Sequence, residues 1–165
     1  MKKIYLVRHA KSSWKDPLLD DVERPLNNRG KRDAPFMGNI LKQLEIIPDK
    51  VITSPAKRAK KTAKMICREI NYPSAEIRTS RILYEHSIDE VIELLQNTDD
   101  DINSIMLVGH NPTLTSLNNY LSDIRIDNIP TCGIVFLEFR TDVWKDVGIE
   151  TGKLVKFEYP KKYLI

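Results

Sequence analysis

Short apolar runs alternate with amphipathic helical segments along almost the whole sequence. Residues 28–45 and 87–95 carry apolar side chains at helical spacing, and further helices are expected from Ser54 and after Pro112. Ser54 and Pro55 suit an N-cap and a first helical position. The runs expected to form strands are residues 4–7, 51–52, 77–79, 105–108, 134–139 and 154–157. This alternation predicts an α/β fold with a largely parallel sheet.

The last two expected strands have no helical segment between them. They should form a hairpin at one edge, which makes the sheet mixed. We predict a three-layer α/β/α sandwich with a mixed, mostly parallel sheet of about six strands. No repeat, low-complexity segment or Pro-, Gly- or Ser-rich linker divides the sequence, so residues 1–165 are expected to form one domain, and we expect a monomer.

The composition excludes several classes of protein. Apolar residues make up 41% and charged residues 30%, which is typical of a folded globular domain rather than a disordered chain. No apolar run approaches the ~20 residues that cross a bilayer, and the first residues lack the apolar stretch of a signal peptide. We therefore expect a cytoplasmic protein with no membrane partner. Cys67 and Cys132 are too few for a disulfide framework and should be reduced and buried.

The positive charge is concentrated in the first part of the chain. Residues 1–68 contain 17 Lys and Arg against 7 Asp and Glu, an excess of ten positive charges, whereas the whole chain carries +3. Such an asymmetry suggests an anionic ligand such as a phosphate, a nucleic acid or an acidic surface. Ordinary solvated helix faces would give the same composition, so charge alone does not decide between these interpretations.

Charged and titratable side chains follow three of the expected strands. Arg8 and His9 come after the first strand, Arg58 comes shortly after the second, and His110 follows the strand at 105–108. In an open parallel sheet, ligands bind outside the carboxyl ends of the strands. The three groups are therefore expected to meet in one cleft, although each alone would also be typical of a loop or a solvated helix.

The residue types in this cleft suit phosphoryl chemistry. Arg8 and Arg58 can each bind two phosphate oxygens, and the start of a helix near Arg58 adds its free N–H groups. His9 and His110 can serve as nucleophile or base, because neighbouring arginines lower the pKa of an imidazole and keep it neutral. The same arginines would stabilise the charge of a phosphoryl group in transfer.

Other sequence motifs of catalysis are absent. The chain has no P-loop, no G-x-S-x-G and no H-E-x-x-H motif. No arginine lies six positions after either cysteine, which excludes a Cys-x5-Arg phosphatase loop. Residues 99–101 form a run of aspartates without the further ligands that a metal site needs. We expect no metal and no cofactor.

Three motifs together resemble the histidine phosphatase superfamily, which is phosphoglycerate mutase-like, and the match is closest to its SixA-type phosphohistidine phosphatases. The motifs occur in family order between residue 4 and about residue 120. Most of the superfamily has Gly after the Arg-His pair, where this chain has Ala10, so we expect a sharper backbone there. The residues that carry the resemblance are Arg8-His9-Ala10-Lys11-Ser12-Ser13-Trp14, Arg24-Pro25-Leu26-Asn27, Arg29-Gly30, Ser54-Pro55-Ala56-Lys57-Arg58-Ala59, Thr62-Ala63 and Val108-Gly109-His110-Asn111-Pro112.

The resemblance implies a role for each candidate residue. His9 would be the nucleophile that forms a phosphohistidine, which water then hydrolyses. The phosphoryl oxygens would be bound by Arg8, Arg58 and His110. Glu85 resembles the position of the family's proton donor. Ser12 resembles a hydroxyl that touches phosphate, and Arg24 resembles an arginine near the substrate entrance.

We therefore predict a metal-independent phosphatase that acts through phospho-His9, with phosphohistidine on protein as the favoured substrate. The connections between the motifs are short, which leaves an open cleft. Such a cleft would also fit a phosphatase of small phosphoesters such as sugar phosphates or nucleotides. A third interpretation is a non-catalytic module in which residues 57–64 bind phosphate or nucleic acid. No aromatic residues interleave that basic run, so we expect no nucleic-acid partner.

Overall fold

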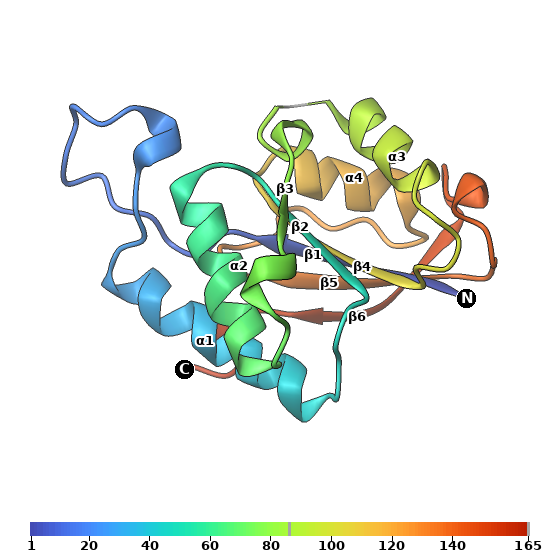
Figure 1. The fold of residues 1–165 in the computed structure, drawn as a ribbon, viewed down its shortest axis with the longest axis horizontal. Helices are drawn as coiled ribbons and strands as arrows, with labels where there is room; N and C mark the ends of the chain where they lie inside the picture. Colours follow the sequence, from blue (N-terminus) through green and yellow to red (C-terminus); the bar gives the residue numbers. More distant parts are fainter. Residues whose placement is uncertain (86, 165) are drawn as a thin grey trace.

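Six strands form one mixed sheet in the order β3-β2-β4-β1-β5-β6 (Figure 1). The computed structural model describes residues 1–85 and 87–164. Neighbouring strands from β3 to β1 pair in parallel, whereas β5 is antiparallel to both β1 and β6. The predicted edge hairpin is therefore confirmed. The strands are β1 (Lys2–Arg8), β2 (Lys50–Thr53), β3 (Arg78–Thr79), β4 (Ser104–Gly109), β5 (Ile134–Phe139) and β6 (Gly152–Glu158).

Two pairs of helices cover the two faces of this sheet (Figure 1). The α-helices are α1 (Asn28–Gln43), α2 (Lys57–Glu69), α3 (Ile88–Gln96) and α4 (Thr113–Leu121). The 3₁₀ turns are η1 (Asp21–Glu23), η2 (Ser74–Glu76), η3 (Arg81–Leu83), η4 (Trp144–Asp146) and η5 (Pro160–Lys162). The predicted three-layer α/β/α sandwich with a mixed sheet is confirmed.

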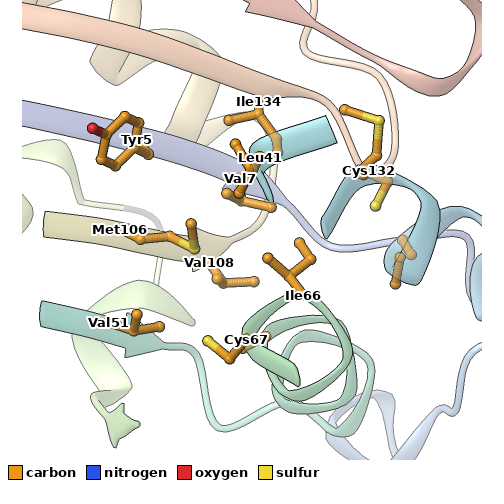
Figure 2. Packing of buried hydrophobic residues seen from close by; sticks show 14 of the residues in the cluster. Tyr5, Val7, Leu41, Val51, Ile66, Cys67, Met106, Val108, Cys132 and Ile134 are labelled. Carbon is orange, nitrogen blue, oxygen red and sulfur yellow. The ribbon is translucent and has the colours of Figure 1, made fainter. Parts of the chain in front are cut away.

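Alternating side chains of each central strand enter two separate cores. Tyr5 and Val7 of β1 pack with α1 and α2, and Figure 2 shows this core, with Leu41 and Ile66 facing the strands. Ile4 and Leu6 point to the other face, toward α3 and α4. Because successive side chains of a strand point to opposite faces, one strand supplies both cores. This burial fixes the register of the sheet, and with it the position of every strand end.

The loop after β1 is held against the start of α1. The side chain of Asn27 caps α1 by accepting a hydrogen bond from the N–H of Gly30, 2.9 Å away. The N–H of Asn27 donates to the carbonyl of Lys11, at 3.0 Å. A Cβ at position 30 would lie 2.2 Å from that carbonyl oxygen, so the close approach requires glycine. The loop behind His9 is therefore fixed by α1.

Two local expectations differ from the structure. Helix α2 begins at Lys57 with Ala56 as its N-cap, so the predicted start at Ser54 is wrong. The Ser54 hydroxyl instead accepts a hydrogen bond from the N–H of Ala56 and contacts His110, so it closes a turn before the helix. Ala10 is not among the described residues with positive φ, so the backbone strain expected there is absent.

The cysteines and the helices bear on two predictions made from the composition. Cys67 and Cys132 are both free and buried, as predicted, and burial raises the pKa of the Cys67 thiol to about 12. Across residues 1–85 and 87–164, no helix is long and apolar enough to span a bilayer.

Candidate active site

A cleft of about 460 Å³ opens where β1, β2 and β4 end. Arg8 is the last residue of β1 and His9 follows it; Arg58 lies in the first turn of α2, and His110 follows β4. All four line the cleft, so the structure brings together the groups that the sequence placed at three strand ends. Backbone hydrogen bonds tie these ends to one another, because the N–H of His9 donates to the carbonyl of Gly109 at 3.0 Å.

His9 is held in one tautomer. The residue is 8% exposed, and Nδ1 lies 2.7 Å from the carbonyl oxygen of Ala10. A carbonyl only accepts hydrogen bonds, so Nδ1 carries the proton and Nε2 keeps its lone pair. Burial lowers the pKa of His9 to about 4, helped by the charges of Arg58 and Arg8, although the bond to Ala10 opposes the shift. His9 is therefore neutral at pH 7.

His110 lies beside His9, and the two ring centroids are 5.0 Å apart. Its Nε2 is 2.7 Å from the hydroxyl of Ser54, which is itself fixed by the turn before α2. The ring of Tyr84 meets His110 edge-on, with centroids 5.5 Å apart. The end of β2 and the region after β3 therefore set the orientation of an imidazole that follows β4.

Arg8 and Arg58 are each anchored through terminal Nη atoms of the guanidinium. Nη1 of Arg8 donates to the carbonyl of Ile129 at 2.9 Å, and Arg58 donates through Nη1 and Nη2 to Asp21. The Nε–H of each guanidinium is buried and has no acceptor among the described residues. An unpaired buried donor is unfavourable on its own and favours an oxyanion beside it.

Asp21 on η1 is the only carboxylate among the described residues that line the cleft. Its Oδ2 lies 2.9 Å from Nη2 of Arg58 and accepts a hydrogen bond from the Tyr84 hydroxyl at 2.8 Å, and its Oδ1 lies 3.1 Å from Arg24. Partial burial would raise the pKa of Asp21, but the hydrogen bonds from Arg58 and Tyr84 outweigh it and hold the pKa far below its ordinary value. Asp21 is therefore ionised, and its contacts with Arg58 and Tyr84 hold η1 at the mouth of the cleft.

Arg24 and Ser12 form the outer wall of the cleft. Arg24 is buried, with its guanidinium 3.3 Å from the ring centroid of Trp14, and it donates to the hydroxyl of Ser12. Arg24 also donates from Nε to the carbonyl of Ser13 and from Nη1 to Asp21. Both residues line the cleft, where Arg24 organises the loop as well as facing the space inside.

Glu85 is the candidate that the structure does not bring to the site. Its side chain is exposed and is not part of the cleft lining, whereas the preceding Tyr84 lines the cleft and bonds Asp21. The sequence reasoning missed Tyr84, Asp21 and Ser54. Their part in the site is seen only from contacts with residues far away in the sequence. The one local signal was the pair of acidic residues at 20–21, shortly before Arg24.

The described residues contain no group of three or more His, Cys, Asp or Glu side chains placed to hold a metal ion. The positive charge of the site comes from side chains instead, since three arginines line one cleft around His9. Such a site binds a dianionic tetrahedral group and stabilises additional negative charge that develops on it.

Comparison with known families agrees with this geometry. The family model of the histidine phosphatase superfamily (branch 1) matches residues 4–94. An uncharacterised protein of Mycobacterium tuberculosis is 33% identical over 165 residues, which cover 94% of this chain and 100% of that protein.

Several solved structures share the fold. The structure of the protein histidine phosphatase SixA complexed with tungstate matches at a TM-score of 0.84 and 21% identity, covering 97% of this chain and 98% of that one. A putative phosphohistidine phosphatase SixA of Agrobacterium tumefaciens matches at a TM-score of 0.77 and 25% identity, covering 96% of this chain and 98% of that one. A mycobacterial glucosyl-3-phosphoglycerate phosphatase matches at a TM-score of 0.67 and 12% identity, covering 96% of this chain and 98% of that one. The fold alone therefore leaves the substrate open.

Proposed function

Since the chain belongs to the histidine phosphatase superfamily, we propose that it is a phosphatase that hydrolyses phosphohistidine on protein with His9 as nucleophile. The tautomer of His9 carries the proposal. Nδ1 is committed to the carbonyl of Ala10, and the low pKa keeps the ring neutral, so Nε2 is an unprotonated nucleophile at pH 7.

The phosphoryl group is bound by Arg8, Arg58 and His110. The unpaired Nε–H groups of both arginines support this assignment, as does the positive end of α2 beside Arg58. The SixA structure with the highest TM-score above holds tungstate, a tetrahedral oxyanion like phosphate. Ser12 and Arg24 complete the binding wall, with Arg24 held in place by Trp14.

The reaction has two displacements. In the first, Nε2 of His9 forms a bond to phosphorus while the bond from phosphorus to the substrate imidazole breaks, and that imidazole leaves with the electron pair. The His9 ring then carries a positive charge and keeps its Nδ1–H on the carbonyl of Ala10. In the second, a water oxygen bonds to phosphorus and the P–Nε2 bond breaks, which returns the electron pair to Nε2; inorganic phosphate leaves as the dihydrogen anion with both protons of that water.

The acid–base groups of the cleft favour phosphohistidine over alkyl phosphoesters. An alkyl ester releases a strongly basic alkoxide and needs a protonated acid beside it. Asp21 is the only carboxyl among the described residues of the cleft lining, and it is held ionised. A phosphohistidine ring protonated on its second nitrogen leaves as neutral imidazole and needs no protein acid. We assign no proton-donor role to the exposed Glu85.

The test compares three substrates in the presence of a metal chelator: an aryl phosphate, glycerol phosphate and a phosphohistidine-bearing protein. We expect hydrolysis of the aryl phosphate and the phosphohistidine protein, slow hydrolysis of glycerol phosphate, and loss of all activity in His9→Ala. Lys145 is exposed, and the variant Lys145→Gln is a control that should keep full activity.

Each other outcome favours a different function. Selective hydrolysis of the alkyl ester would favour the small-phosphoester phosphatase. Full activity of His9→Ala would contradict the nucleophile assignment. Absence of turnover with every substrate would leave the cleft as an anion-binding site without catalysis.

A further inference from the structure

A row of basic side chains follows α2 away from the phosphate cleft. The members are exposed and recur at helical spacing, so they lie along one side of the helix. They line two adjoining hollows of about 470 and 330 Å³, which share Lys61 and Lys64. We name this surface the basic groove; its cations are Lys57, Lys60, Lys61, Lys64 and Arg68.

The basic groove and the phosphate cleft share a wall. Asp21 of η1 lines the cleft, while the next two residues, Val22 and Glu23, line the groove. On α2, Arg58 lines the cleft and the adjacent Lys57 lines the groove. A molecule lying in the groove would therefore reach the mouth of the cleft within one helical turn.

The charges of the basic groove are not compensated inside the molecule. None of its five cations pairs with a carboxylate among residues 1–85 and 87–164, and Glu23 is the one acidic residue described in its lining. Like charges three and four positions apart on a helix repel one another. The groove thus presents an unpaired field that an acidic partner would relieve.

The lining between the lysines favours a protein partner over a nucleic acid. Val22, Pro55 and Ile77 supply partly buried apolar surface to the first hollow, and none of the described residues that line it is aromatic. The ring of Tyr72 reaches only the second hollow and is 7% exposed. Single-stranded nucleic acids need exposed rings on which bases stack, whereas carboxylates with interspersed apolar side chains match this lining.

We propose that the basic groove docks an acidic segment of the phosphoprotein substrate and so delivers its phosphohistidine to the cleft. The proposal rests on the proposed function for the identity of the substrate. From Lys57 to Arg68 the row spans roughly 16 Å at the helical rise per residue, which is the length of a short acidic segment. Opposite charges across such a contact act mainly on the rate of encounter and on the choice of partner.

The test uses two synthetic phosphohistidine peptides that differ only in a segment of glutamates or of glutamines beside the phosphohistidine. Wild-type protein should show a kcat/KM about tenfold higher for the glutamate peptide at about 50 mM salt, with little preference at about 0.5 M. The variant Lys60→Glu/Lys64→Glu should lose the preference and keep its kcat/KM for an aryl phosphate. That retained activity also reports that the variant is folded.

A matched control is Lys145→Glu/Lys156→Glu, which changes the net charge equally. Lys145 lies on η4 next to α3, and Lys156 lies on the edge strand β6, whereas the groove lies beside β2 and β3 at the other side of the sheet. The control should keep the preference for the glutamate peptide. If both variants lost the preference for the glutamate peptide equally, only the net charge would act, and the groove would not be the docking site. If wild type showed no preference, the proposal would also be overturned.

A binding measurement separates this proposal from the proposed function. Fluorescence anisotropy with the unphosphorylated glutamate peptide should detect binding to wild type and to the control, but not to Lys60→Glu/Lys64→Glu. Binding without phosphohistidine hydrolysis would retain the docking surface and refute the proposed substrate. Tighter binding of a labelled single-stranded oligonucleotide, lost in the same variant, would contradict a protein partner.

Discussion

Replacing His9 by Gln should make the stability of the protein less sensitive to acid. The folded protein lowers the pKa of His9 from 6.5 to about 4, mainly by burial. In the unfolded chain the same ring takes up a proton near its ordinary pKa of 6.5. The neutral ring therefore stabilises the fold fully above pH 6.5, and this contribution is lost progressively as the pH falls toward 4.

The size of the effect follows from the shift in pKa. The full shift corresponds to about 3 kcal/mol of unfolding free energy, and about 2 kcal/mol of it is already lost at pH 5. Urea unfolding at pH 8 and pH 5, followed by the fluorescence of the fully buried Trp144, measures this loss. His9→Gln should lose about 2 kcal/mol less than wild type between the two pH values.

The other titrating groups are common to both proteins, so their contributions cancel in the comparison. An equal loss of stability in wild type and His9→Gln would show that folding does not lower the pKa of His9, because the ring would then titrate alike in the folded and unfolded states. Nitrogen NMR of labelled histidine gives an independent check. It should show a neutral His9 at pH 5 with the proton on Nδ1.

Three further substitutions test other parts of the site. Asp21→Asn should lower stability by about 1 kcal/mol at pH 7, since the carboxylate is half exposed, and in urea titrations the difference from wild type should persist at pH 5 and shrink only as the pH falls below the ordinary carboxyl pKa of 3.8. Gly30→Ala should destabilise by about 1–3 kcal/mol in thermal unfolding, because its Cβ would meet the Lys11 carbonyl; an unchanged Tm would contradict the close packing. Ser54→Ala should lower kcat/KM about tenfold by releasing His110, and unaltered kinetics would show that the hydroxyl does not orient the ring.

The parts of the fold that follow from local pattern were predictable. Apolar runs and helical periodicity located the strands and helices, because burial on two faces of a sheet imposes those patterns. The placement of Arg8, His9 and His110 on one cleft followed from the rule that the carboxyl ends of parallel strands meet. That rule needs only that the three strands run parallel, which the alternation of strands and helices predicts.

The missed residues depend on contacts that no local pattern encodes. Asp21 reaches Arg58 across 37 positions, and Tyr84 reaches Asp21 across 63, through side chains on a 3₁₀ turn and an irregular segment. Ser54 was interpreted as a helix cap because Ser-Pro is a common start of a helix, whereas here its hydroxyl serves a turn and His110. Specific polar contacts between distant segments carry no periodic signal in the sequence.

Trapping the phosphoryl group on the protein tests most directly whether His9 is the nucleophile. Wild-type protein is mixed with a phosphohistidine-bearing protein, quenched in alkali, which preserves phosphohistidine, and digested for mass spectrometry. We expect one phosphoryl group on the peptide that contains His9, bonded to Nε2, formed before phosphate is released and absent in His9→Ala. Release of phosphate at the full rate with no phosphorylated His9, or with the phosphoryl group on another residue, would contradict His9 as the nucleophile.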